Sequence, residues 1–480
     1  MSSSSYGDQD PIAALATPLG ESALALIRTS GEAAIEIVAS VFSRPAKLIN
    51  APSHTVVHGW IVDPSSQKKI DEVLISIYRS PNSYTGEDCA DISCHGGIAV
   101  VKAIMSLLKA SGFRDALPGE FSFRAFMNGK LDLTKAESVM ELVSSKTNRA
   151  REQAVRRLSG ILQNEINDVK NLLVRVLAGI EIYLDYSEDE FSTGNGDTPN
   201  DEEAGRLPDR ELAEEAASRL QTLAGLWQQE RIYAEGALAV LAGRPNAGKS
   251  SLFNYLIRED RSIVTDIPGT TRDWIEALIS VDDIPLKLAD TAGLRKLREA
   301  DEAERMGIER SHELLENADL VLYVIDGTEG ITQEDRDNIS TLPEKRLIVL
   351  WNKADLAKPV APKNEDRGFP GSVQMLAVSA KTGEGISDLL RLMAGLLETP
   401  KAAAIKTGVI CGPGTLRQKE LIDSALASVM EALGLAANEE PLDIIAPLFR
   451  SAIDALGEIT GEISNADILE TMFSSFCVGK

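Results

Sequence analysis

The pattern of apolar and polar positions divides the chain into three kinds of segment. Residues 12–130 alternate short apolar runs with Gly and Pro, which predicts an α+β domain. One helix is expected over Ile98–Lys109. The expected strands are Ile12–Ala16, Ala23–Arg28, Thr55–Val62, Glu72–Tyr78 and Cys89–Cys94.

From about Thr134 the apolar residues recur every three or four positions, the spacing of amphipathic helices. Residues 134–186 contain almost no Gly or Pro and predict long helices of a bundle. Residues 187–203 hold seven acidic and no basic residues, which indicates a solvated loop. Helical spacing resumes over Glu211–Glu235 and again over residues 415–475.

Between Leu238 and Glu398 short apolar strands alternate with helical segments. This alternation is typical of a doubly wound α/β fold with a parallel sheet. The expected strands are Leu238–Ala242, Leu286–Ala289, Leu320–Ile325, Leu347–Trp351 and Met375–Val378. The sequence therefore predicts a multidomain α/β protein in which helical segments flank this α/β region on both sides.

Composition narrows the class of protein. The 480 residues include 44% hydrophobic and 25% charged residues, which excludes a mainly disordered or collagen-like chain. No run has the ~18 apolar residues of a membrane span, and no leader segment is expected. Four Cys are too few for a disulfide framework, so a reducing cytoplasm is expected. A net charge of −24 predicts weak non-specific attraction to nucleic acid.

A phosphate-binding motif follows the strand Leu238–Ala242. The residues Gly243–Ser250 match G-x-x-x-x-G-K-[ST] between a strand and a helix. The glycines allow backbone N–H groups to wrap phosphate oxygens, Lys249 adds a charge at the β- and γ-phosphates, and Ser250 is expected to bind Mg²⁺. The nucleotide-binding residues expected here are Asn246, Ala247, Gly248, Lys249, Ser250 and Ser251.

Four further elements specify GTP. Asp290, Thr291, Ala292 and Gly293 follow a strand and suit Mg²⁺ and the γ-phosphate. A switch loop holds Thr265, Asp266, Ile267, Pro268, Gly269, Thr270 and Thr271, of which Thr271 completes the Mg²⁺ shell. Asn352, Lys353 and Asp355 form the third element, where Asp355 accepts hydrogen bonds that guanine donates and adenine lacks. Ser379, Ala380 and Lys381 form the fourth and present a backbone N–H to guanine O6.

The hydrolytic residue is not given by these motifs. The position that holds a water-orienting Gln in small signalling GTPases is Leu294 here. Glu302 and Glu304 are candidates for that role, although a charged stretch of this kind is usually a solvated helix face. The amide oxygen of Asn246 is a candidate ligand for a monovalent cation.

Segments across the whole chain resemble the MnmE (TrmE) family of GTPases, which modify the wobble uridine of certain tRNAs. The resemblance rests on the GTPase motifs and on Ile12–Pro18, Pro81–Asp88, His95–Gly97, Pro118–Phe121, Arg124–Leu133, Glu458–Glu462 and Phe476–Lys480. It implies an N-terminal folate-binding and dimerisation domain over residues 1–133. It also implies a helical domain in two parts, 134–236 and 399–480, with a Ras-like G domain inserted over 237–398.

The resemblance also implies ligands and partners. A methylene- or formyl-tetrahydrofolate would contact Arg28, Asp91, Lys130 and Lys480, with Asp91 standing where most relatives carry Glu. K⁺ would be bound by Asn246, Thr265, Ile267 and Thr270, and Glu304 would position water. The family forms a homodimer and works on tRNA with an FAD-dependent GidA (MnmG) partner in an α₂β₂ complex. Together they install an aminomethyl or carboxymethylaminomethyl group at uridine C5.

Several features keep alternatives open. Cys477 either has a functional role near the folate site or lies in a frayed tail. The C-V-G-K ending that contains it does not fit a prenylation box. Cys89, Cys94 and His95 have weak metal-site spacing and are expected to be structural, as are His54 and His58. Lys146, Arg149, Arg151, Arg156 and Arg157 form a basic run that suits either tRNA or a solvated helix face. The alternative function is a ribosome-assembly GTPase that acts as a switch on RNA.

Overall fold

The computed structural model describes residues 6, 10–185, 207–259, 276–290, 313–342, 346–356, 373–398, 411–463, 466–474, 476 and 478–479. The chain forms two compact units, one of Met1–Met140 with Leu456–Lys480 and one of Glu141–Ala455.

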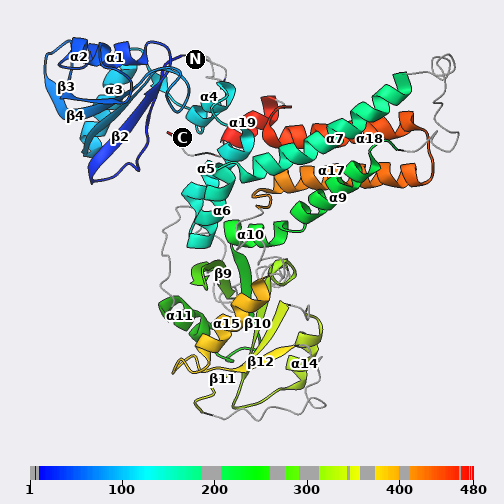
Figure 1. Ribbon diagram of the computed structural model, residues 1–480. Helices are drawn as coiled ribbons and strands as arrows, with labels where there is room; N and C mark the ends of the chain where they lie inside the picture. The colour runs from blue at the N-terminus through cyan, green and yellow to red at the C-terminus, as the bar shows by residue number, and fades with distance from the viewer. Residues whose placement is uncertain are drawn as a thin grey trace, which may run out of the picture. The chain divides into compact units, whose positions relative to one another are not determined.

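The first unit is built on a six-stranded sheet of order β3-β4-β5-β2-β1-β6, which Figure 1 shows with its helices. Neighbouring strands are antiparallel except for β1 and β6. The expected strands and the expected helix are confirmed, with ends within three residues of the prediction. The strands are β1 Ile12–Leu15, β2 Ser22–Ser30, β3 Thr55–Val62, β4 Lys69–Tyr78, β5 Cys89–Gly96 and β6 Arg114–Asp115.

Helices cover one face of this sheet. Alternate residues of the strands, such as Ile27, Ile75 and Ile92, are buried against Val38 and Ile104 of the helices. The period of two therefore leaves the intervening residues on the opposite face. The helices of this region are α1 Ala34–Ser40, α2 Pro45–Ile49, α3 Ile98–Ala110 and α4 Glu120–Met127, of which only α3 was predicted.

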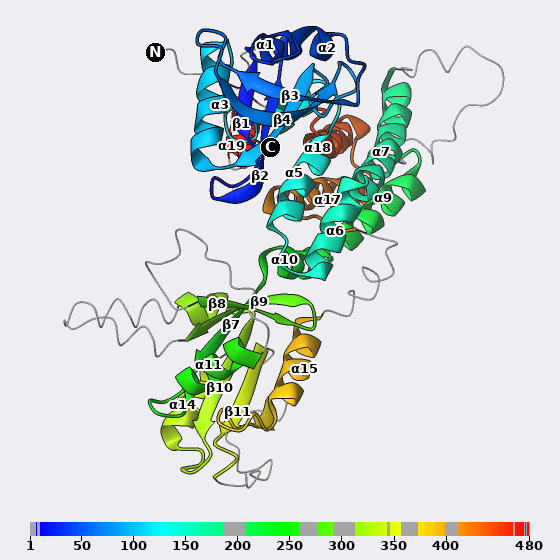
Figure 2. The same cartoon turned by 90° about the vertical axis from the view of Figure 1, so that its left-hand side faces the viewer.

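The run that predicts long helices is divided into three. The helix α6 begins after Thr147, whose side chain accepts a hydrogen bond from the Ala150 N–H at 3.2 Å. Gly160, with φ of +90°, separates α6 from α7. The helices α7, α9 and α17 lie side by side (Figures 1 and 2). The helical elements are α5 Leu133–Ser144, α6 Asn148–Leu158, α7 Ile161–Asp185, α9 Arg210–Ala224, α10 Trp227–Glu235, α17 Leu416–Ala437, α18 Leu442–Thr460 and α19 Ala466–Ser474.

A second six-stranded sheet lies in the second unit, in the order β12-β11-β10-β7-β9-β8. Its strand pairs are parallel, as expected of a doubly wound fold, except that the edge strand β8 pairs antiparallel with β9. The strand β8 is the one strand of this sheet that was not predicted. The helices α11 Lys249–Glu259 and α15 Ile386–Leu397 pack on one face and α14 Gln333–Ser340 on the other. The strands are β7 Ala237–Ala242, β8 Glu276–Val281, β9 Ile284–Asp290, β10 Leu320–Asp326, β11 Leu347–Asn352 and β12 Gln374–Ala377.

The strand order reverses at β7. The chain continues from β7 to β9 on one side and then to β10 on the other side. In open α/β sheets, ligands bind outside the carboxyl ends of the strands at such a point. The loop that follows β7 therefore lies where a nucleotide is expected.

Candidate functional site

The loop between β7 and α11 requires its two motif glycines. Gly243 has φ of +128°, and a Cβ at this position would lie 2.3 Å from the Val324 carbonyl oxygen. Gly248 has φ of +95°, and a Cβ there would lie 2.1 Å from Nδ2 of Asn352. Between them Asn246 has the left-handed φ of +63°. These conformations curl the backbone tightly in front of the N-terminus of α11.

The polar side chains at the start of α11 have defined partners. The nearly buried Lys249 donates from Nζ to the carbonyl oxygens of Gly243 and Arg244, both at 2.7 Å. The Ser250 hydroxyl donates to Oδ2 of Asp290 at 2.8 Å. This serine and this carboxylate, 40 positions apart in sequence, therefore form a pair of hard oxygen ligands of the kind that Mg²⁺ prefers.

The predicted guanine-binding elements are brought together at the ends of β11 and β12. Asn352 donates from Nδ2 to the Ala247 carbonyl oxygen at 2.9 Å, and its Oδ1 accepts from the Ala380 N–H at 3.2 Å. The Ser379 hydroxyl donates to Oδ1 of Asp355 at 2.7 Å. Asn352 thus connects the phosphate loop with the last element, and Asp355 is held in place by the serine of that element. Two other predicted residues are exposed: Ser251 is the third residue of α11, and Lys381 follows Ala380.

Several predicted site residues lie outside the described part of the chain. They include the whole switch loop and the predicted catalytic acid. These residues are Thr265, Asp266, Ile267, Pro268, Gly269, Thr270, Thr271, Thr291, Ala292, Gly293, Glu302, Glu304, Cys477 and Lys480. Their roles stay predictions.

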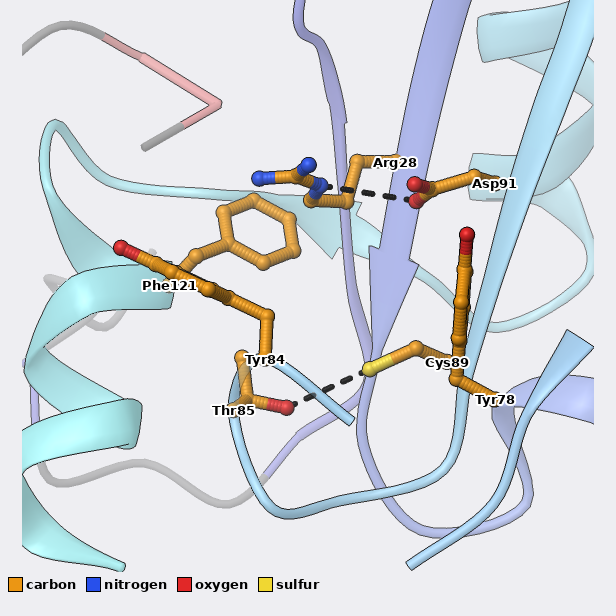
Figure 3. A pocket seen from close by; sticks show the side chains of 7 residues that line it. All are labelled: Arg28, Tyr78, Tyr84, Thr85, Cys89, Asp91 and Phe121. Atoms are coloured by element: carbon orange, nitrogen blue, oxygen red, sulfur yellow. Dashed lines mark hydrogen bonds and ion pairs between the residues drawn. The ribbon is translucent and has the colours of Figure 1, made fainter. Parts of the chain in front are cut away.

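A second candidate site is a cavity of about 240 Å³ in the first unit (Figure 3). Arg28 of β2 and Asp91 of β5 stand directly opposite each other in the antiparallel register, on the face of the sheet away from α1 and α3. Arg28 Nε lies 3.5 Å from Asp91 Oδ1. The register of the two strands therefore creates the ion pair at the edge of the cavity.

Aromatic rings form the walls of this cavity. Tyr84 and Phe121 lie on one side and Tyr78 on the other (Figure 3). The Arg28 guanidinium carbon is 5.4 Å from the Tyr84 ring centroid and 5.8 Å from that of Phe121, close enough for cation–π attraction. Burial raises the pKa of Asp91 above its usual value, although Arg28 opposes that rise. The cavity thus offers a cation, a carboxyl group and flat apolar walls.

Comparison with known proteins gives matches along nearly the whole chain. The family model described as GTP-binding protein TrmE N-terminus matches residues 11–130, and the MnmE helical domain model matches residues 133–477. The chain belongs to the MnmE family of tRNA modification GTPases. The tRNA modification GTPase MnmE of Treponema denticola is 41% identical, covering 99% of both chains. That of Carboxydothermus hydrogenoformans is 40% identical, covering 98% of this chain and all of the relative.

Membership of the MnmE family confirms the predicted family and fold class. The chain is a GTPase of tRNA modification with an N-terminal TrmE-type domain, a helical domain and a G domain. A solved G domain of the T. maritima FeoB iron transporter is 25% identical over 34% of this chain and 99% of its own, with a TM-score of 0.26. The assignment to tRNA modification rests on the full-length relatives, and these do not favour the alternative of a ribosome-assembly GTPase.

The cavity brings together two of the four predicted folate contacts. Arg28 and Asp91 line it, whereas Lys130 is not among its lining residues and donates from Nζ to the Pro81 carbonyl oxygen at 2.9 Å. Lys480 is not described, but its neighbour Gly479 accepts a hydrogen bond from Arg28 Nη1 at 3.3 Å. The sequence alone assigned no binding role to Tyr78, Tyr84, Thr85, Cys89 or Phe121, and Cys89 was expected to be structural. Tyr84, Thr85 and Phe121 do lie in segments that carry the family resemblance, which is the only signal that pointed to them.

The cysteines and histidines that raised the question of a metal have ordinary partners. The Cys94 thiol lies 3.6 Å from the Ala25 carbonyl oxygen, and His95 Nδ1 lies 2.7 Å from Asp71 Oδ1. His58 pairs with Glu72 at 2.9 Å. Among the residues that the structure describes, no group of three or more His, Cys, Asp or Glu side chains could hold a metal ion. No described helix combines the length and the apolar character that crossing a membrane requires.

Proposed function

We propose that this GTPase hydrolyses GTP to drive insertion of a carboxymethylaminomethyl or aminomethyl group at C5 of the wobble uridine of certain tRNAs. A one-carbon tetrahydrofolate bound to the N-terminal unit supplies the carbon. The chain acts in the cytoplasm as a homodimer within an α₂β₂ complex with an FAD-dependent partner of the GidA (MnmG) type. The G domain, over residues 237–398, is inserted in a helical domain of 134–236 and 399–480.

One observation carries the proposal: one chain of this family combines a guanine-nucleotide loop with a separate cavity whose chemistry suits a pterin. Arg28 and Asp91 offer a donor and a carboxyl group for the polar edge of the ring, and the rings of Tyr84 and Phe121 suit its flat face. The volume of about 240 Å³ is below the roughly 300–1,000 Å³ of sites for drug-sized ligands. The cavity therefore suits the bicyclic ring, with the rest of the folate outside it, where Lys130 and Lys480 are proposed to bind.

The proposed roles at the nucleotide follow from the chemistry of each side chain. Lys249 and the loop N–H groups neutralise the phosphates, and Asp355 selects guanine over adenine. The hydroxyls of Ser250 and Thr271 would bind Mg²⁺, whose positive charge would neutralise part of the negative charge on the phosphate oxygens. K⁺ is bound by Asn246, Thr265, Ile267 and Thr270 and adds positive charge where an arginine finger acts in other GTPases.

Glu304 is the proposed catalytic acid that positions the attacking water. Replacement Glu304→Ala is expected to keep GTP affinity near that of the wild type and to remove most hydrolysis, because the side chain acts on water rather than on the nucleotide. Single-turnover hydrolysis and equilibrium binding of a GTP analogue measure the two properties. Turnover equal to that of the wild type would contradict the assignment.

The folate proposal is tested by thermal unfolding of the full chain with and without 5-formyl-tetrahydrofolate. Ligand at 100 times its Kd stabilises the folded form by about 2.7 kcal/mol. The shift in the wild type is expected to vanish in Arg28→Met. It should persist in Arg44→Met, which changes an exposed arginine outside the cavity. Absence of a shift in the wild type, or an equal shift in Arg28→Met, would refute the assignment of this cavity to folate.

A further inference from the structure

The segment 326–335, which joins β10 to α14, sends a carboxylate to each of two nucleotide motifs. Asp326 at its start reaches Lys353 in the guanine motif, and Asp335 at its end reaches Arg244 in the phosphate loop. We call this segment the brace. Neither contact belongs to the sequence motifs that define the GTP site.

Asp335 is a fixed anchor for the phosphate loop. Its side chain is 1% exposed, and its Oδ2 accepts from the Thr332 N–H at 3.0 Å and hydroxyl at 2.8 Å in the capping box of α14. Its Oδ1 accepts from the Tyr323 hydroxyl at 3.1 Å and from Arg244 Nε at 3.1 Å. The N-terminus of α14 and Tyr323 of β10 therefore hold this carboxylate independently of Arg244.

Arg244 connects Asp335 with Lys249, the lysine of the phosphate loop. It is the second residue of the loop, and its side chain is 19% exposed between Asp335 and the exposed Glu329, to which Nη2 donates at 2.9 Å. Its own carbonyl oxygen accepts from Lys249 Nζ at 2.7 Å. Anchoring the Arg244 side chain therefore fixes one of the two carbonyl oxygens that orient the lysine.

Asp326 holds the guanine motif as Asp335 holds the phosphate loop, through a carboxylate that is itself fixed by hydrogen bonds. Its Oδ1 accepts from the Thr328 N–H at 2.9 Å and hydroxyl at 2.7 Å, and its Oδ2 accepts from Lys353 Nζ at 2.5 Å. Burial alone would raise the pKa of Asp326, but the hydrogen bonds from Lys353 and Thr328 outweigh it and lower the pKa. The carboxylate is thus charged at neutral pH. The neighbouring Gly327 N–H donates to the Asn352 carbonyl oxygen at 2.8 Å, which ties the backbone of the motif to the brace as well.

We propose that Asp326, and Arg244 through Asp335, are positioning residues that hold the guanine motif and the phosphate loop in their binding geometry as one unit. The proposal rests on the GTP site proposed above. Each carboxylate is already hydrogen-bonded within its own turn by Thr328 or Thr332, so the bonds to Lys353 and Arg244 are additional. A site that is fixed before the ligand arrives loses less entropy on binding and keeps its charges aimed at the reacting phosphate.

The two ends of the brace predict different kinetic defects in the full-length protein. Asp326→Asn keeps an acceptor for Thr328 but loses the charge that holds Lys353. Loss of one charge-assisted hydrogen bond should weaken GDP and GTP binding equally, by about tenfold, and raise KM while kcat stays within about twofold. Arg244→Met keeps the length of the side chain but frees the loop. It should lower kcat about tenfold and change GDP affinity less than about threefold.

Dissociation constants for fluorescent GDP and for a GTP analogue, together with kcat and KM, measure these defects. Glu329→Gln is the matched control, because it keeps an acceptor for Arg244, removes only a charge at the exposed end of the contact, and should leave every constant within about twofold. Arg244→Lys, which restores a charge toward Asp335, should recover part of kcat even if Arg244→Met lowers the melting temperature.

The outcomes separate the proposal from a merely structural role. GDP and GTP affinities of Asp326→Asn equal to those of the wild type would overturn it, and so would unchanged kcat in Arg244→Met. The proposal would also be overturned if nucleotide affinity and kcat fell by the same factor, in proportion to the fall in melting temperature, and if Arg244→Lys recovered neither. Failure of the wild type to bind GDP would instead refute the proposed GTP site.

Discussion

Replacement of Arg157 by Met should be among the most destabilising single changes in the second unit. The Arg157 side chain is 1% exposed. Its Nε lies 2.7 Å from Glu141 Oε2, and its Nη1 lies 2.8 Å from Glu230 Oε2, whose side chain is fully buried. Burial opposes the charged form of Arg157, but the two glutamates outweigh it and hold its pKa above the usual value. The methionine would fill much of the same space and remove the guanidinium that both carboxylates contact.

The magnitude follows from the burial of the partners. Removing one member of a buried ion pair costs about 3–5 kcal/mol, because the remaining charge is uncompensated. Glu230 would still accept from the Gly412 N–H at 3.2 Å, and the Glu141 side chain is 11% exposed, so a value of about 4 kcal/mol is expected. For a unit of this size each kcal/mol corresponds to about 2–4 °C in Tm, so the transition should fall by about 8–16 °C.

The assay is hydrogen exchange of the amides of α6 and α10, combined with calorimetry of the full chain. Arg157→Met should raise exchange in both helices, and adding Glu230→Gln should recover part of the loss since it removes one orphaned charge. Arg210→Met is the control, because Arg210 forms an exposed pair with Glu214 whose removal should cost less than about 1 kcal/mol. Equal effects of Arg157→Met and Arg210→Met would refute the reasoning from burial.

Three further predictions concern the nucleotide site and the thiols. Gly248→Ala should abolish GDP binding in titration calorimetry, because its Cβ would meet Asn352 at 2.1 Å, whereas Gly395→Ala, with open space around it, should bind normally. Burial raises the pKa of Cys94 to about 11 and of Cys411 to about 12, so a thiol reagent at pH 8 should modify them only after unfolding. Since these pKa values are raised, the associated stability is complete below the ordinary thiol pKa of about 8.5 and is lost as pH rises toward 11–12. GTP turnover should rise severalfold when K⁺ replaces Na⁺, and equal rates in a phosphate-release assay would remove K⁺ from the mechanism.

Strong periodicity made most of the architecture predictable. The strands β7, β10 and β11 are buried on both faces and read as continuous apolar runs, so they were identified without ambiguity. The antiparallel edge strand β8 was missed because Glu276–Val281 is a short segment with no turn signal before it. The short helices α1 and α2, of seven and five residues, have too few turns for a period of 3.6 to emerge.

The nucleotide site was predictable to the extent that its residues are contiguous. The loop 243–250 carries its chemistry in one stretch, and the guanine elements each follow a strand. The contacts between motifs were not predictable from one sequence. The pair of Arg28 and Asp91 depends on the register of β2 with β5, and the pair of Arg244 and Asp335 joins segments 91 positions apart. Such pairs are set by tertiary packing, which local patterns do not encode.

The basic run, of which all residues but Lys146 lie on α6, shows how packing changes the meaning of a charge pattern. Three of its cations, Arg149, Arg151 and Arg157, form ion pairs with carboxylates. Arg149 donates to Glu398 at 2.6 Å and to Asp282 at 3.1 Å. A cation already paired in this way releases few counterions on binding RNA and adds little to affinity. Arg151 also lies 3.7 Å from Glu152, and the net charge of the chain is −24, so we expect α6 alone to attract tRNA weakly. We therefore expect tRNA affinity to depend on the partner protein and to be low for the isolated chain at physiological salt.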